Sequence, residues 1–83
     1  MLRAKFATLR HILQDLGFTM QADEKRVRFD HAPSKTWFLY RPFADDEEVP
    51  PIDLVAARYM LDMKGLLPRD EFEEQLRRNL VAG

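Results

Sequence analysis

The sequence has no cysteine, only three glycines, and no apolar run longer than four residues, as at 54–57. The absence of cysteine excludes disulfide bonds, thiol nucleophiles and cysteine-ligated zinc. A helix that spans a bilayer needs about 20 apolar residues, and the first residues lack the apolar segment of a signal peptide. We therefore expect a cytoplasmic protein that is neither secreted nor inserted into a membrane.

Charges of the two signs nearly cancel, but they are unevenly distributed. The formal net charge is −1 at pH 7. Residues 1–43 carry eight basic and four acidic side chains, whereas residues 44–83 carry five basic and ten acidic ones. This asymmetry predicts a basic face beside an acidic one. A basic face would suit a nucleic-acid ligand, although solvated surfaces of small domains also show such imbalance.

Hydrophobic periodicity in the first half predicts one helix followed by three strands. Apolar residues at steps of three and four predict a helix over about 3–16, which Gly17 ends. Alternating apolar and polar residues predict short strands at about 18–22 and 26–31. The β-prone segment 36–43 predicts a third strand that is central or well covered.

The second half predicts helices. An acidic loop at 44–51 leads through two prolines into a helix that runs to about residue 64 and is apolar over most of its girth. A short final helix follows Pro68, with Phe72, Leu76 and Leu80 on one face. The whole predicts a single α+β domain over residues 1–83. It would have a three-stranded antiparallel sheet, helices on one face, and an extra short C-terminal helix.

Two surfaces are candidates for binding. Basic residues on the predicted strands and turns, near three aromatic side chains, suit phosphate contacts and base stacking; they are Lys25, Arg26, Arg28, Lys35 and Arg41. The same cations would also serve to protect an exposed sheet edge. The adaptable side chains Tyr59, Met60 and Met63 suit an interface with another chain or a second copy, unless both sides of their helix are packed within the domain.

No catalytic or metal site is predicted from the residues themselves. His11 and His31 lie in different elements, and neither has a nucleophile, a base or a metal ligand set beside it in the sequence. The four carboxylates at 45–48 lack the interleaved glycine and the distant glutamate of a calcium loop. We therefore predict no catalytic residue, no metal and no cofactor.

Several strings across most of the chain resemble the HicA toxin family, whose members are small mRNA-cleaving proteins with a double-stranded-RNA-binding-like fold. These strings are Leu9-Arg10 to Leu16-Gly17-Phe18, Arg28-Phe29-Asp30-His31-Ala32-Pro33, Arg58-Tyr59-Met60-Leu61, Gly65-Leu66 and Arg69-Asp70-Glu71-Phe72. The resemblance implies an α-β-β-β-α core, and it implies RNA or an antitoxin-like protein as partner.

The sequence departs from that family at its catalytic position. Family members carry a glycine-serine-histidine triplet at the start of the second strand, and the histidine is their general acid and base. The corresponding residues here are Glu24-Lys25-Arg26. Arg26 keeps a positive charge but cannot act as a base near neutral pH. The resemblance therefore implies a non-catalytic domain that binds RNA or DNA. The alternatives are an interaction or dimerisation module and, third, an active toxin that uses His31.

Overall fold

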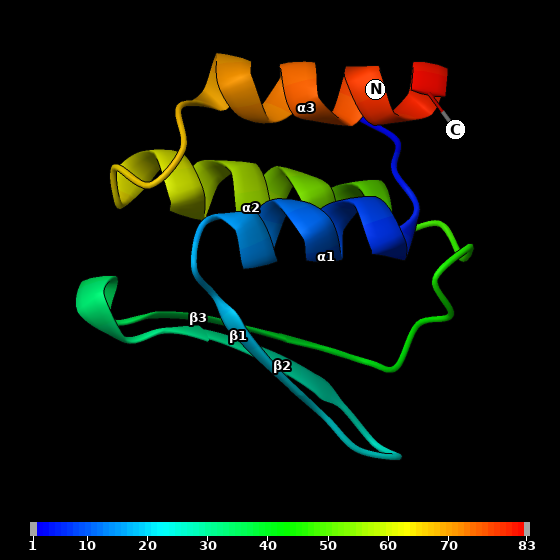
Figure 1. Ribbon diagram of the computed structural model, residues 1–83, viewed down its shortest axis with the longest axis vertical. Coiled ribbons are helices and arrows are strands. Elements are labelled where there is room, and N and C mark those ends of the chain that lie inside the picture. Colours follow the sequence, from blue (N-terminus) through cyan, green and yellow to red (C-terminus); the bar gives the residue numbers. More distant parts are fainter. Residues whose placement is uncertain (1, 83) are drawn as a thin grey trace.

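The fold places three helices and three strands in the order helix, three strands, two helices (Figure 1). The computed structural model describes residues 2–82, without the side chains of 79–82. The elements are α1 (Phe6–Asp15), β1 (Thr19–Ala22), β2 (Val27–His31), the 3₁₀ turn η1 (Ala32–Ser34), β3 (Thr36–Tyr40), α2 (Pro51–Met63) and α3 (Arg69–Ala82). The strands form one antiparallel sheet in the order β1-β2-β3. The predicted α+β class and antiparallel sheet are thus confirmed.

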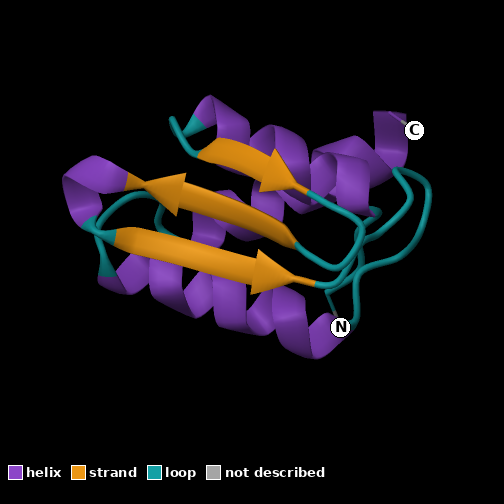
Figure 2. Cartoon of the chain, turned by 90° about the horizontal axis from the view of Figure 1, so that it is seen from below, coloured by secondary structure: helices purple, strands orange, loops and turns teal. Residues whose placement is uncertain are grey.

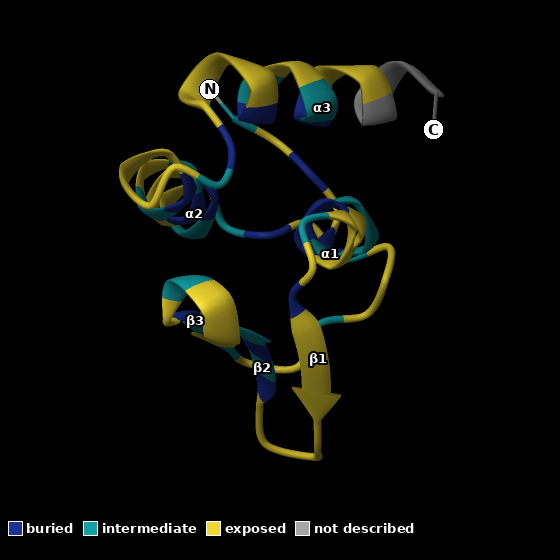
Figure 3. Ribbon diagram, turned by 60° about the vertical axis from the view of Figure 1, so that its left-hand side comes forward, coloured by how far each residue is buried: buried dark blue, intermediate teal, exposed yellow. Residues whose placement is uncertain are grey.

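The elements form three layers (Figures 1 and 3). Helices α1 and α2 run in the same direction over one face of the sheet, and α3 packs across both of them on their other side. The opposite face of the sheet carries no described helix (Figure 2). Because α1 and α2 form the middle layer, each must present apolar side chains to the sheet and to α3.

The register of the sheet assigns each side chain to a face. Phe29 lies opposite Met20 and Phe38, whereas Arg28 lies opposite Gln21 and Leu39. The first set points toward the helices and the second toward the open face, since side chains alternate along a strand. The alternation predicted from the sequence for residues 26–31 therefore holds in β2.

The prediction that the third strand is central or well covered is wrong. Strand β2 is central, because strands joined by short turns pair in sequence order. Strand β3 is an edge strand, and it ends at Tyr40 instead of residue 43. The apolar residues of β3 are divided between the two faces of the sheet. Phe38 and Tyr40 face the core, whereas Trp37 and Leu39 lie exposed on the open face, so an apolar sequence here does not require a central strand.

The start of α1 is fixed by the acidic loop. The backbone N–H of Phe6 donates to the carbonyl of Glu47 over 2.8 Å, and the N–H of Ala7 donates to that of Asp45 over 3.0 Å. A further bond, from the N–H of Val49 to the carbonyl of Ala4, is 2.9 Å long. The loop thus takes up N–H groups that have no partner within the helix. Extended pairing before Phe6 explains why α1 starts later than the predicted residue 3.

The last helix is longer than predicted. It has 14 residues, more than either other helix. Phe72 and Leu76 are buried against the middle layer, as their four-residue spacing predicted. The side chain of Leu80, which the same pattern places on this face, lies outside the described residues. The description "short" is therefore wrong, and α3 is a full layer of the fold.

The same substitution at a buried and at an exposed leucine tests the layered core. Leu61 is fully buried in α2, whereas Leu39 on β3 is 45% exposed. We expect Leu61→Ala to lower the free energy of unfolding by about 2–5 kcal/mol, because it leaves a cavity. Leu39→Ala should cost less than about 1 kcal/mol. Urea unfolding followed by circular dichroism measures both, and equal losses would contradict the layering.

Candidate functional site

The five basic residues predicted to bind nucleic acid lie at separate places. Lys25 and Arg26 occupy the exposed turn between β1 and β2, and Arg41 follows β3 at the same end of the sheet. Arg28 lies in the middle of the open face. Lys35 lies in the turn before β3, at the other end of the sheet. It is at least about 13 Å along the strands from each of the other four residues. No single basic face brings all five together.

Two of the five are already paired with carboxylates. The Nε atom of Arg28 lies 2.8 Å from a carboxylate oxygen of Asp30, and the guanidinium stacks over the ring of Trp37 at 4.9 Å. The hydrogen bond from Arg28 lowers the pKa of Asp30. Arg41 binds Glu47 at 2.7 Å, and this bond lowers the pKa of Glu47. The charges of both arginines are thus largely compensated within the chain.

The acidic loop accounts for much of the charge asymmetry. Besides Arg41, it engages Arg10 through Asp45 at 3.3 Å and Arg3 through Glu48 at 2.9 Å. Three of its four carboxylates therefore contact arginines from the first half of the chain. The loop screens basic residues that the sequence alone leaves available to an anionic ligand.

His31 belongs to a local network that fixes the η1 turn. Its Nδ1 atom lies 2.7 Å from the Oγ of Ser34, which in turn donates to the Oγ1 of Thr36 over 2.8 Å. The imidazole packs against Phe18, with ring centroids 5.1 Å apart. No carboxylate of the described residues orients this ring, and His11 lies apart on the surface of α1. These contacts hold the turn in place.

Helix α2 carries a row of exposed apolar side chains, which we call the α2 stripe. It consists of Ile52 (77% exposed), Val55 (42%), Tyr59 (65%) and Met63 (56%), at steps of three, four and four. The opposite side of the helix is buried through Leu54, Ala57 and Leu61. Such spacing places the four exposed side chains on one face of the helix.

The α2 stripe includes two of the three residues predicted to form a partner interface. Tyr59 and Met63 lie on it, whereas Met60 is half-buried beside it. Sequence reasoning missed Ile52 and Val55. The signal that points to them is the helix's apolar character on nearly every side, because a helix that packs on a sheet and on one other helix still leaves one side uncovered.

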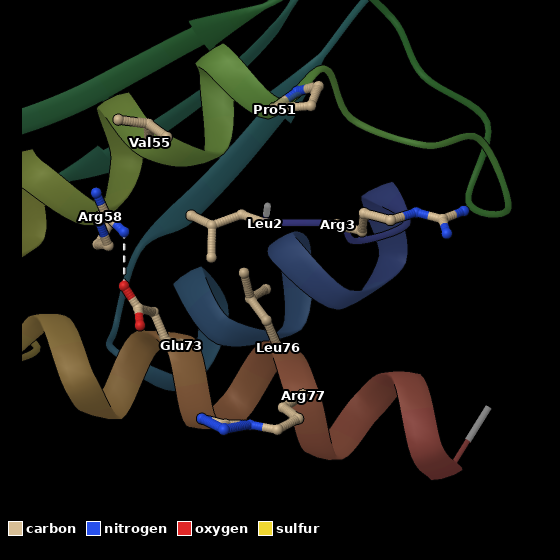
Figure 4. A pocket seen from close by; sticks show the side chains of 8 residues that line it. All are labelled: Leu2, Arg3, Pro51, Val55, Arg58, Glu73, Leu76 and Arg77. Carbon is tan, nitrogen blue, oxygen red and sulfur yellow. Dashed lines mark hydrogen bonds and ion pairs between the residues drawn. The ribbon is translucent and has the colours of Figure 1, made fainter.

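Two hollows flank Val55 and Arg58, and together they form what we call the α2–α3 groove. The first, of about 510 Å³, has an apolar floor that includes Leu2, Val55 and Leu76, and Figure 4 shows Leu2 and Leu76 converging there. Arg77 lies beside it on α3, whereas the side chain of Arg3 extends away from Leu2 and Leu76, toward Glu48 of the acidic loop. The second hollow, of about 380 Å³, lies along Ile52, Val55 and Tyr59. The groove thus continues from the stripe to α3.

An ion pair joins the two helices at the centre of this groove. The Nη1 atom of Arg58 lies 2.6 Å from the carboxylate of Glu73, which Arg69 also contacts at 3.3 Å (Figure 4). Both side chains of the Arg58–Glu73 pair are less than a third exposed. The hydrogen bond from Arg58 is the main reason that the pKa of Glu73 is lowered. The pair fixes the spacing of α2 and α3 and the position of Arg58.

Within the described part of the chain, no helix is long and apolar enough to cross a membrane. The same residues contain no group of three or more histidine or acidic side chains positioned to hold a metal ion. Comparison of the chain with protein-family models, with curated proteins and with solved structures finds no match.

The contribution of Glu73 to stability should depend on pH. Its pKa is lower in the folded than in the unfolded chain, so the folded state binds fewer protons and loses stability as the pH falls from about 4.3 through the folded pKa. We expect Glu73→Gln to lower Tm at pH 7 and to have progressively less effect as the pH falls below about 4.3, the ordinary pKa of glutamate. Thermal unfolding between pH 3 and 7 measures this difference.

The matched control is Glu71→Gln, since Glu71 contacts Arg78 at 3.4 Å in an exposed pair on the same helix. It should change Tm little at any pH, because exposed pairs contribute little. A Tm difference for Glu73→Gln that stays constant down to pH 3 would show that its ion pair is not the cause.

Proposed function

We propose that the chain is a protein-binding domain that receives its partner on the α2 stripe and in the α2–α3 groove. The observation that carries this proposal is the row of four large apolar side chains left exposed on a helix whose other side belongs to the core. Contiguous apolar patches of this kind on soluble proteins typically mark interaction sites. The function is binding, with no catalytic step.

The chemistry of the surface fits a protein partner. Complete burial of an isoleucine, valine or methionine side chain is worth about 1.5–3 kcal/mol. A partner gains the share that corresponds to the exposed part of each stripe residue, which helps to offset the entropy lost on association. Tyr59 and Arg58 are of the residue types that dominate binding energies at interfaces. The Arg58–Glu73 pair holds Arg58 in place before binding, which reduces the entropic cost of ordering it.

The double-stranded-RNA-binding-like arrangement and the HicA-like relationship are part of this proposal. Support for the arrangement comes from the order α1-β1-β2-β3-α2 and from the position of both helices on one face of the sheet. Arg26, where that family carries histidine, directly precedes β2 on an exposed turn. A domain of this type without a general base is suited to binding, and an antitoxin-like protein is one class of partner.

Nucleic-acid binding is a second candidate, favoured by the open face of the sheet. Trp37 is 53% exposed there, and a hollow beside it is lined by Lys35, Gln21 and Asp30. An exposed aromatic ring with a nearby cation suits the stacking of an unpaired base. The scattered positions of the other cations make this surface weaker than the α2 stripe.

Site-specific photocrosslinking in cells tests the protein-binding proposal. A benzophenone side chain placed at Tyr59 should give one discrete adduct with a partner, and Val55→Asp should abolish it because a charge in the stripe cannot be buried. The control is the same probe at Trp37, which is similarly exposed on the open sheet face. Adducts at Trp37 and none at Tyr59 would contradict the proposal.

RNA titration at two salt concentrations tests the second candidate. If nucleic acid binds the sheet beside Trp37, affinity for a short single-stranded RNA should fall steeply from 50 to 200 mM salt, and Lys35→Gln should reduce the salt slope by about 1. Fluorescence anisotropy measures this. The absence of binding at 50 mM salt would remove the candidate.

A further inference from the structure

We infer that the partner of the α2–α3 groove is an acidic amphipathic helix. This inference rests on the proposed protein-binding function and adds the chemistry and shape of the partner. It starts from a local reversal of charge. The chain as a whole is slightly acidic, and residues 44–83 carry twice as many acidic as basic side chains, yet the groove formed mainly by this acidic half is basic.

The charges that line the groove are four arginines and two carboxylates. Arg3, Arg58 and Arg77 line the first hollow together with Glu73, and the second hollow adds Arg69 and Asp62. Glu73 is already bound by Arg58 and Arg69, so its acceptor capacity is partly used inside the groove. The remaining positive charge lies around an apolar floor. Such a surface is complementary to a ligand that combines apolar and acidic side chains.

Arg77, beside the first hollow, is able to exchange partners. It contacts Glu74 at 3.1 Å, and both side chains are about half exposed or more. Exposed pairs of this kind contribute little to stability. A partner's carboxylate therefore displaces Glu74 at little cost, and it gains a stronger bond as the surrounding water is excluded.

The shape of the surface favours a helix. The α2 stripe extends from residue 52 to residue 63, about 16 Å along the helix axis, which corresponds to three helical turns of a partner. Its steps of three and four form a ridge against which the apolar face of another helix packs. An amphipathic helix with apolar residues at i, i+3 or i+4, and i+7 has the matching period.

A second copy of the chain is the less suitable occupant. In a symmetric dimer the same patch is present on both sides, so two surfaces that each carry more arginines than carboxylates would be brought together. Juxtaposed like charges oppose association. An acidic partner has no such repulsion.

Three labelled 18-residue helical peptides test the inference. They share leucines at i, i+3, i+7 and i+11 and differ only in the flanking residues, which are glutamate, glutamine or lysine. In fluorescence anisotropy at 50 mM salt we expect the glutamate peptide to bind about tenfold more tightly than the glutamine peptide, and the lysine peptide most weakly. The difference should narrow at 0.5 M salt, because screening weakens exposed ion pairs.

Variants at the rim give opposite shifts. Arg77→Gln should weaken binding of the glutamate peptide several-fold and leave that of the glutamine peptide unchanged. Glu74→Gln should strengthen binding of the glutamate peptide about two- to threefold, because this substitution removes the carboxylate that competes for Arg77 within the chain. The matched control is Arg78→Gln. Arg78 is similarly exposed on α3 and lies outside both hollows, so this change should have little effect.

The outcomes separate this inference from the function on which it rests. Equal binding of the glutamate and glutamine peptides, lost in Val55→Asp, would overturn the acidic chemistry and leave the protein-binding surface intact. Tightest binding of the lysine peptide, or no binding of any peptide, would overturn the inference. So would sedimentation of the wild type as a dimer that Val55→Asp dissociates. If no peptide binds and the probe at Tyr59 also gives no crosslinked partner, the proposed function itself is contradicted.

Discussion

The packing of α1 and α2 between the sheet and α3 is the constraint on which the rest of the structure depends. Each of these helices must bury two sides at once, and the fully buried leucines Leu9, Leu13, Leu54 and Leu61 belong to this middle layer. A helix that is apolar on nearly every side meets this demand and has apolar surface left over. In α2 that remainder is the α2 stripe, which exists because α3 covers only one flank of the helix. Fold and candidate site therefore share one cause.

Electrostatics in this chain join segments that are distant in sequence. The acidic loop contacts Arg3, Arg10 and Arg41, and its backbone carbonyls complete the first turn of α1. The loop thereby anchors the first helix while compensating charges near it. In the groove, by contrast, arginines come together from the start of the chain, from α2 and from α3. Net charge along the sequence is consequently a poor guide to the sign of any one surface.

Local patterns made most of the elements predictable. Gly17, with φ at +97°, ends α1 as expected, and the buried Val27 and Phe29 lie on one face of β2 as their alternation predicted. Strand order was harder to predict, because the apolar residues of β3 are compatible with a central strand and with an edge strand that has one face open. The term short understated α3, since the spacing of Phe72, Leu76 and Leu80 by itself already spans more than two helical turns.

The candidate site was only partly predictable, for the same reason. Tyr59 and Met63 were recognisable from residue type, but the exposure of Ile52 depends on where α3 ends its cover of α2. The pairing of Arg3 with Glu48 joins residues 45 positions apart, and no local pattern reports such a contact. The partner of Arg28 was recoverable, because Asp30 lies two residues later on the same face of the strand, whereas the pairing of Arg41 with Glu47 depends on how the loop after β3 folds.

The β1–β2 hairpin projects away from the helices, and all four residues of β1 are exposed (Figures 1 and 3). Its backbone bonds are therefore sheltered by little besides the neighbouring strand, which is the situation in which local opening takes least free energy. Amide hydrogen exchange should accordingly be graded across the molecule, fast in β1 and slow in the middle layer. The groove lies between α2 and α3, on the side of the middle layer away from the sheet, so fraying of the hairpin leaves the shape of the groove intact.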